Sequence, residues 1–196
     1  MNRRDAIKNL SLTFGVTIAT PTLLSILNAC SNNEQEWVPD YLNRTQEYMI
    51  RHLVDIMLPK SETPGGVELN IVQFIDKMIA HTMTKKDQQL FNQGYLEFDN
   101  TFHNIYKKVS LKGTKEDYKT LLEMYFNISE EKQQLIFKQL ESNVLDLEKK
   151  PKLFIYKFLT TIRYYSLLGF YTSQEIMEGQ LNYNANMGYY ESCVDL

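Results

Sequence analysis

The sequence predicts an all-α fold, a single compact multi-helix domain that ends in an irregular, tyrosine-rich tail. Three observations support this prediction. Apolar residues recur at spacings of three and four along most of the chain after residue 40, which is the period of a helix with one buried face. Threonine or serine stands where several of these segments begin, as an N-cap would. The period-two alternation of half-buried strands is scarce.

The first helix is expected over residues 45–58, where the apolar side chains fall on one face. Pro59 would end it, because proline has no amide hydrogen to donate within a helix. The Ser-Glu-Thr-Pro-Gly-Gly run at residues 61–66 is predicted to be a turn. It lacks the lysine and the preceding strand of a phosphate-binding loop. A second helix is expected over residues 67–83.

Thr84 is predicted to cap a third helix, with Asp87 three positions later in the acidic half of a capping box. Apolar side chains continue along this helix as far as Ile105. Gly113 separates it from a fourth helix, whose capped start is the Thr-Lys-Glu-Asp run at residues 114–117.

Ser129 is expected to open a fifth helix, and Pro151 marks the start of a sixth. The segment from Pro151 to Phe170 is the most apolar part of this region, so it is predicted to be the central, most buried helix. From residue 171 to residue 196 the helical pattern gives way to the irregular tail.

Residues 1–29 have the pattern of an export signal. Arg3 and Arg4 lie in a short basic stretch, and no charged residue follows from residue 10 to residue 27. The arginine pair resembles a twin-arginine signal, which exports folded proteins, although Ala6 stands where phenylalanine is usual. The Leu-Asn-Ala-Cys run that ends at Cys30 resembles a lipobox, with Asn28 an unusual member. An ordinary secretory lipoprotein signal is the alternative.

Cleavage and lipidation at Cys30 would leave a polar tether at residues 30–40 and a helical domain at residues 41–196. The protein is therefore expected on the periplasmic side of a bacterial membrane, held by its acyl chains. Loss of residues 1–29 removes three of 21 basic and one of 24 acidic side chains, so the net charge becomes −5. This balance argues against nucleic-acid binding.

Cys193 would be the one cysteine left unlipidated. It is expected either to bond to another chain or to remain a free thiol of no importance.

The sequence offers no recognisable catalytic, cofactor-binding or metal-binding site. His52, His81 and His103 lie on different predicted helices without a second ligand at helical spacing, so surface or boundary roles are favoured. Buried carboxylates among Asp55, Asp76 and Asp99 are expected to cap backbone groups or to form ion pairs.

Tyrosine is concentrated near the C-terminus. Six of the thirteen tyrosines fall in the last 33 residues, namely Tyr164, Tyr165, Tyr171, Tyr183, Tyr189 and Tyr190. Tyrosine supplies amphipathic contact area and is enriched at protein interfaces. Docking onto a partner is favoured over packing of these rings around the helical core.

The chain resembles the family of gluconate 2-dehydrogenase subunit 3, the small subunit of a membrane-bound dehydrogenase, over about residues 41–195. The early blocks are Leu-Val-Asp-Ile-Met-Leu-Pro at 53–59, Thr-Pro-Gly-Gly at 63–66 and Phe-Ile-Asp at 74–76, followed by Phe91, Gly94, Leu96 and Asp99. The most specific blocks are Gly-Phe-Tyr-Thr-Ser at 169–173, Leu-Asn-Tyr at 181–183 and Gly-Tyr-Tyr-Glu-Ser-Cys at 188–193. Met187 stands where the family often has proline.

The resemblance implies a non-catalytic accessory subunit without a cofactor of its own. Its partner would be a large FAD-containing dehydrogenase subunit of the glucose-methanol-choline type, with a cytochrome c subunit carrying haem in some complexes. The candidate partner interface comprises Tyr171, Thr172, Ser173, Tyr183, Tyr189, Tyr190 and Cys193. A stand-alone exported lipoprotein that binds another protein or ligand is the alternative, and activity of the chain alone is a third hypothesis for which no site was found.

Overall fold

Helix α3 (Arg44–Met57) opens the described part of the fold, and its start is fixed by a capping box. The Asn43 side chain accepts hydrogen bonds from the backbone N–H groups of Thr45 and Gln46, and the Gln46 side chain accepts one from Asn43 N–H. The computed structural model describes residues 37–141 and 151–181. Among these described residues, those from Pro39 onward belong to one compact unit.

Helix α4 (Ile71–Thr82) begins four residues later than the predicted start at residue 67. Asn70 has φ 55, a left-handed conformation that a right-handed helix cannot include. The loop before it folds back onto the end of α3, where Gly66 N–H donates to the Leu58 carbonyl at 2.8 Å. A Cβ on Gly66 would lie 2.6 Å from a methyl carbon of Val54, so the predicted turn at residues 61–66 is held closely against α3.

The next two helices begin where their caps predicted. Helix α5 (Lys85–Tyr106) has Thr84 as N-cap, whose side chain accepts from Asp87 N–H. Helix α6 (Lys115–Phe126) starts with a capping box between Thr114 and Asp117. A short 3₁₀ helix, η1 (Ser110–Lys112), lies between them and was not predicted. Lys107, with φ 54, ends α5 in the left-handed conformation typical of helix C-termini.

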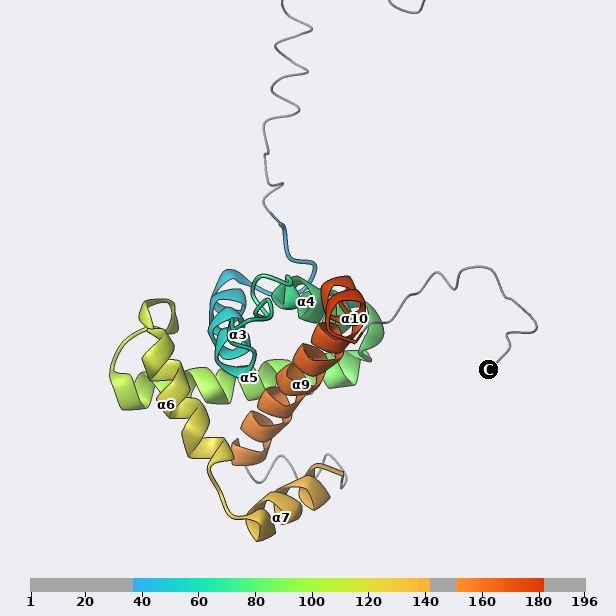
Figure 1. Ribbon diagram of the computed structural model, residues 1–196. Coiled ribbons are helices and arrows are strands. Elements are labelled where there is room, and N and C mark those ends of the chain that lie inside the picture. The colour runs from blue at the N-terminus through green and yellow to red at the C-terminus, as the bar shows by residue number, and fades with distance from the viewer. Residues whose placement is uncertain (1–36, 142–150, 182–196) are drawn as a thin grey trace, which may run out of the picture. The chain divides into compact units, whose positions relative to one another are not determined.

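Helix α7 (Glu130–Glu141) follows Ser129 as predicted, and helix α9 (Pro151–Thr172) is the predicted central helix. Figure 1 shows α9 crossing α5, with α10 at its C-terminal end. The prediction of an irregular tail from residue 171 was wrong for residues 171–179. Helix α9 continues to Thr172, and α10 (Gln174–Gly179) follows it, because Ile176 is buried in the domain. In the described residues the regular structure is helical, so the all-α prediction is confirmed.

The centre of the core is the contact between α5 and α9. Phe158 on α9 packs against Phe91 and Phe98 on α5, with ring centroids 5.0 and 5.7 Å apart. The backbones approach closely at Gly94, where an added Cβ would lie 2.3 Å from the Phe154 carbonyl oxygen and 2.7 Å from the Phe158 Cβ. This crossing therefore has no room for a side chain at residue 94, and only glycine fits there.

Replacing Gly94 with alanine should destabilise the domain. Forcing a methyl group into this contact costs about 3 kcal/mol, and the higher helix propensity of alanine returns about 1 kcal/mol. We expect a net loss of about 2 kcal/mol in the free energy of unfolding, measured by urea denaturation. Gly179→Ala is the matched control, because nothing lies within 4 Å of an added Cβ there. Equal effects of the two substitutions would contradict the packing argument.

Candidate partner-binding site

The predicted interface residues that the structure describes lie at the junction of α9 and α10. Tyr171 is exposed in the last turn of α9. Thr172 donates its hydroxyl hydrogen to the Leu168 carbonyl at 2.7 Å, and Ser173, the N-cap residue of α10, donates to the Phe170 carbonyl at 2.8 Å. Their hydroxyl groups thus shape the junction. The other predicted positions, Arg3, Arg4, Cys30, Tyr183, Tyr189, Tyr190 and Cys193, lie outside the described residues.

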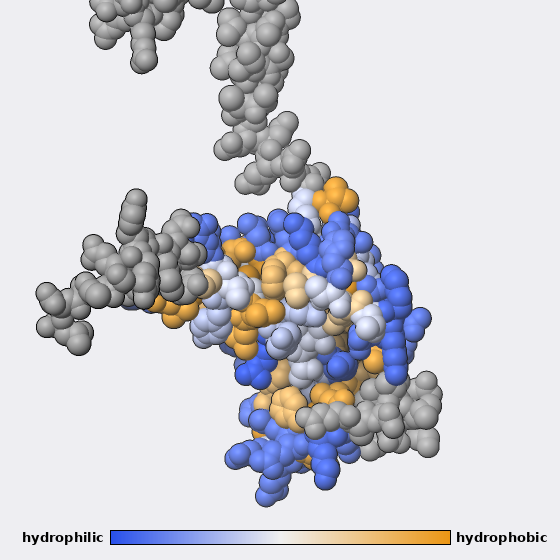
Figure 2. All heavy atoms as spheres, turned by 90° about the vertical axis from the view of Figure 1, so that its right-hand side faces the viewer, coloured by the Kyte–Doolittle hydropathy of each residue, from blue (hydrophilic) through white to orange (hydrophobic). Residues whose placement is uncertain are grey.

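An exposed apolar stripe runs along the C-terminal half of α9. Tyr164, Leu167 and Tyr171 follow one another at spacings of three and four, so they share one face of the helix. Their exposed fractions are 63%, 37% and 55%. In the N-terminal half of the same helix, residues 153–156, 158 and 159 are buried, whereas Pro151 and Lys152 are exposed. Figure 2 shows hydrophobic residues reaching the surface between hydrophilic ones on the face that it presents. Such a stripe on a surface helix is typical of a docking face.

Two hollows border this stripe, which we call the α9 stripe. Leu167 lines a cavity of about 480 Å³ whose walls also come from α3, α6 and α7. Tyr164 lines a second hollow of about 530 Å³, together with Lys157 and Tyr165. Phe137 on α7 lines both hollows. The stripe is therefore a ridge between two hollows. Side chains of a partner can enter the hollows on either side of it.

Sequence reasoning found only part of this stripe. Tyr171 was in the predicted interface, Tyr164 was counted only as one of the clustered tyrosines, and Leu167 was missed. The available signal was their spacing on one helical face, which becomes visible once α9 is extended to Thr172.

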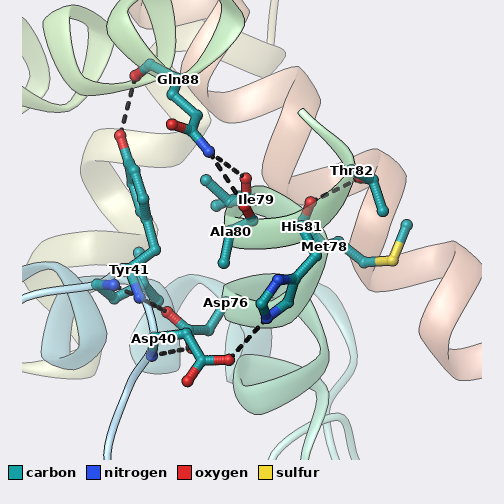
Figure 3. Close-up of polar contacts among 10 residues, drawn as sticks. Asp40, Tyr41, Asp76, Met78, Ile79, Ala80, His81, Thr82 and Gln88 are labelled. Carbon is teal, nitrogen blue, oxygen red and sulfur yellow. Dashed lines mark hydrogen bonds and ion pairs between the residues drawn. The ribbon is translucent and has the colours of Figure 1, made fainter. Parts of the chain in front are cut away.

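A cluster of polar groups, separate from the α9 stripe, fixes the chain segment that leads into α3 (Figure 3). The carboxylate of Asp76, on α4, is fully buried and accepts three backbone hydrogen bonds. The donors are the N–H groups of Asp40 at 2.7 Å, Leu42 at 2.8 Å and Tyr41 at 3.0 Å. His81 Nε2 lies 2.9 Å from the Asp40 carboxylate. We call this arrangement the Asp76 clamp; it attaches the end of the predicted tether, at Asp40, and the two residues after it to the middle of α4.

The same segment is also attached to α5. The Tyr41 hydroxyl donates to the Gln88 carbonyl at 3.0 Å, and the Gln88 side chain donates to the carbonyl of Ile79 at 2.8 Å and that of Ala80 at 3.3 Å (Figure 3). The buried amide of Gln88 thereby satisfies carbonyl groups near the end of α4 that lack helical partners.

The predicted role as a cap or an ion-pair partner is found for Asp76 and Asp55, whereas Asp99 bonds to a side-chain hydroxyl group instead. Asp76 accepts the three backbone bonds described above. Asp55 pairs with Lys115 at 2.6 Å, and Asp99 accepts a hydrogen bond from the Ser110 hydroxyl.

His52 lies in an aromatic cluster. Its ring stacks on Tyr118 at 5.1 Å and meets the Tyr48 ring edge-on at 4.7 Å. Burial lowers the pKa of His52 below the usual value for histidine, while the neighbouring Asp55 carboxylate acts in the opposite direction. The position favours a neutral imidazole that contributes to packing.

The described residues contain no group of three or more His, Cys, Asp or Glu side chains arranged to hold a metal ion. Within the same residues, every helix is too short or too polar to span a bilayer.

These features define an all-α domain built on one central helix, with an apolar stripe exposed at the end of that helix. The chain belongs to the gluconate 2-dehydrogenase subunit 3 family, whose model matches residues 44–188 of the 196. The resemblance predicted from the sequence blocks is thereby confirmed. The family name describes a subunit of a multi-subunit dehydrogenase. Comparisons with curated proteins and with solved structures gave no match.

Replacing Asp76 with asparagine should destabilise the domain strongly. The amide would place an NH₂ group against backbone N–H donors and would remove the charge that strengthens all three bonds. We expect a loss of about 3 kcal/mol in the free energy of unfolding, measured by urea denaturation. Asp55→Asn is the control, because its ion pair with Lys115 is partly exposed and should contribute less than about 1 kcal/mol. A loss at Asp76 no larger than that at Asp55 would disprove the clamp.

Proposed function

We propose that this protein is a non-catalytic accessory subunit of a membrane-associated, flavin-dependent gluconate or sugar dehydrogenase complex. In this proposal it assists the folded export, stability and membrane anchoring of the catalytic subunit. The family match over residues 44–188 carries the proposal. FAD would belong to the large subunit, and haem to a cytochrome subunit where one is present.

The α9 stripe supports docking of the large subunit at this position. Tyrosine and leucine side chains exposed on one rigid helix lose little conformational entropy on binding and bury apolar area. Tyr171 also begins the part of the chain that carries the remaining predicted interface residues, from Tyr183 to Cys193. The proposed interface therefore runs from α9 towards the C-terminus along the sequence.

The sequence pattern supports the export and anchoring roles. A twin-arginine signal serves proteins that fold before export, and a flavoprotein loaded with FAD in the cytoplasm has that requirement. In the proposed complex, Arg3 and Arg4 would direct both subunits to the membrane and Cys30 would hold them there. The Asp76 clamp would give the tether a firm attachment to the helical domain.

Replacing Tyr164 and Tyr171 together with serine should weaken the complex. Buried interface tyrosines commonly contribute about 2 kcal/mol each, so the affinity for the flavoprotein should fall roughly 1,000-fold. The flavin absorbance that co-purifies with the tagged small subunit from membranes measures this loss.

Met124→Ser is the matched control for the tyrosine variant. Met124 is 56% exposed on α6 and lines neither hollow. Both variants should retain the unfolding free energy of the wild type within about 1 kcal/mol. Undiminished flavin recovery with the tyrosine variant would place the interface elsewhere, and no flavoprotein with the wild type would favour a stand-alone lipoprotein.

Replacing Arg3 and Arg4 with lysine tests the escort role. Folded export through a twin-arginine signal depends on the arginine pair, so the flavoprotein should remain in the cytoplasmic fraction together with the variant. Cell fractionation and immunoblotting of both subunits measure this outcome. Lys8→Arg keeps the charge of the signal and should leave export unchanged. Normal export of the flavoprotein with the paired lysine variant would refute the escort role.

A further inference from the structure

The junction between α5 and α6 exposes apolar side chains among lysines. Ile105, Val109 and Leu111 are 43%, 55% and 41% exposed, and none of them lines either hollow beside the α9 stripe. Lys107 lies between the first two along the chain and Lys112 follows the third, and both lysines are exposed. Figure 1 shows this junction on the opposite side of the domain from α10. We call these five residues the basic corner.

Ser110 fixes the backbone of the basic corner. It is buried, its hydroxyl donates to the Asp99 carboxylate, and its carbonyl accepts a hydrogen bond from the Tyr118 hydroxyl at 2.8 Å. Its two neighbours in the sequence, Val109 and Leu111, are the exposed ones. Because the residue between them is held by two hydrogen bonds, these apolar side chains project from a firm support and cannot easily fold back onto the domain.

The basic corner is positive in a protein that is negative overall. Residues 100–115 contain four lysines and no acidic residue, whereas the whole chain has a formal net charge of −3. Two of these lysines are paired with carboxylates from outside the stretch. The other two, Lys107 and Lys112, form no ion pair within the described residues. Their charges are therefore available to an anionic surface.

We propose that the basic corner docks onto an anionic lipid bilayer, with Val109 and Leu111 among the head groups and the two unpaired lysines beside lipid phosphates. Apolar burial and electrostatic attraction act together in such a contact. The inference rests on the proposed lipid anchor at Cys30, which would bring the domain to a bilayer. It goes beyond anchoring because a second contact would fix which side of the domain faces the membrane.

The short chain between Cys30 and the Asp76 clamp favours this contact. Asp40, which the clamp holds, follows Cys30 by ten positions, and an extended chain spans about 3.5 Å per residue. The anchor would therefore lie within about 35 Å of Asp40, so some side of the domain must be close to the bilayer. An acidic protein is the alternative occupant. The corner lines neither hollow into which side chains of a protein could insert, which favours the bilayer.

Spin labelling of the full chain, isolated from membranes and placed on vesicles, tests the proposal. The label is attached at Val109→Cys in a chain that also carries Cys193→Ser. Electron paramagnetic resonance measures its accessibility to oxygen, which concentrates in bilayers, and to a water-soluble nickel chelate. On phosphatidylglycerol vesicles the label should become protected from nickel and accessible to oxygen. On phosphatidylcholine vesicles it should stay accessible to nickel. The Cys193→Ser chain alone measures any labelling at Cys30.

A label at Met124→Cys is the matched control for position. Met124 is 56% exposed, against 55% for Val109, but it has no lysine within four positions in the sequence. A label there should remain accessible to nickel on both kinds of vesicle. Protection at both positions would show that exposure alone decides the result, and it would overturn the role of the basic corner.

A pair of lysine variants tests the charge. Lys107→Gln together with Lys112→Gln should lower the ratio of protected to accessible label at position 109 roughly 30-fold, because each lysine near an anionic membrane strengthens binding roughly 5-fold. Lys132→Gln together with Lys138→Gln removes the same charge from exposed positions of α7 and should leave the ratio unchanged. Equal losses in the two double variants would overturn the proposal.

Two further results would overturn it. The first is a label at position 109 that stays accessible to nickel on phosphatidylglycerol vesicles. The second is a label that becomes protected only when the flavoprotein is added, which would assign the corner to a protein interface. Flotation with phosphatidylcholine vesicles, which lack the charge that the corner needs, reports the lipid anchor alone. Failure of the anchor and failure of the basic corner are therefore distinguishable.

Discussion

The close approach of α5 and α9 at Gly94 is the constraint on which the other helix positions depend. With no side chain at this crossing, the backbone of α9 can reach α5, and Phe158 enters between Phe91 and Phe98. This contact sets where the remaining surface of α9 points. Near the C-terminal end of α9, Gly169 allows a similar close approach to α4. An added Cβ there would lie 2.7 Å from the Phe74 ring. Two glycines thus hold α9 against its neighbours along most of its length.

Because α9 is held so closely, one helix serves two purposes along its length. Its first half carries most of its buried side chains, whereas its second half has one face in the core and one exposed. Side chains on the exposed face have positions fixed by the core contacts beneath them. The Tyr164, Leu167 and Tyr171 side chains therefore lie on a rigid support, which reduces the entropy lost when a partner binds.

Most of the helices were predictable from local sequence, because helix caps and helical periodicity depend on residues that lie close together in the chain. Thr84 and Thr114 cap their helices as expected, and Pro151 begins the central one. The errors came from tertiary contacts. The left-handed conformation of Asn70 follows from the loop that folds against α3, and the helical state of residues 171–179 follows from burial of Ile176. No local pattern contains either contact.

The candidate site was predictable to a smaller extent for the same reason. The concentration of tyrosines pointed to the right end of the chain, but which rings share a face depended on where α9 ends. The hydrogen bonds of Asp76 join residues 34 to 36 positions apart in the sequence, so the sequence could offer only a general role for that carboxylate. The family blocks included Asp76 without indicating its partners.

If the chain is anchored at Cys30, as proposed, the Asp76 clamp has a mechanical consequence. A pulling force on the chain before Asp40 would meet three hydrogen bonds that converge on one carboxylate, so they would share the load and would have to break together. Without the clamp, the same force would reach the first turn of α3 and could unwind it one bond at a time. The carboxylate therefore turns a junction that could be peeled open into one that resists tension as a unit.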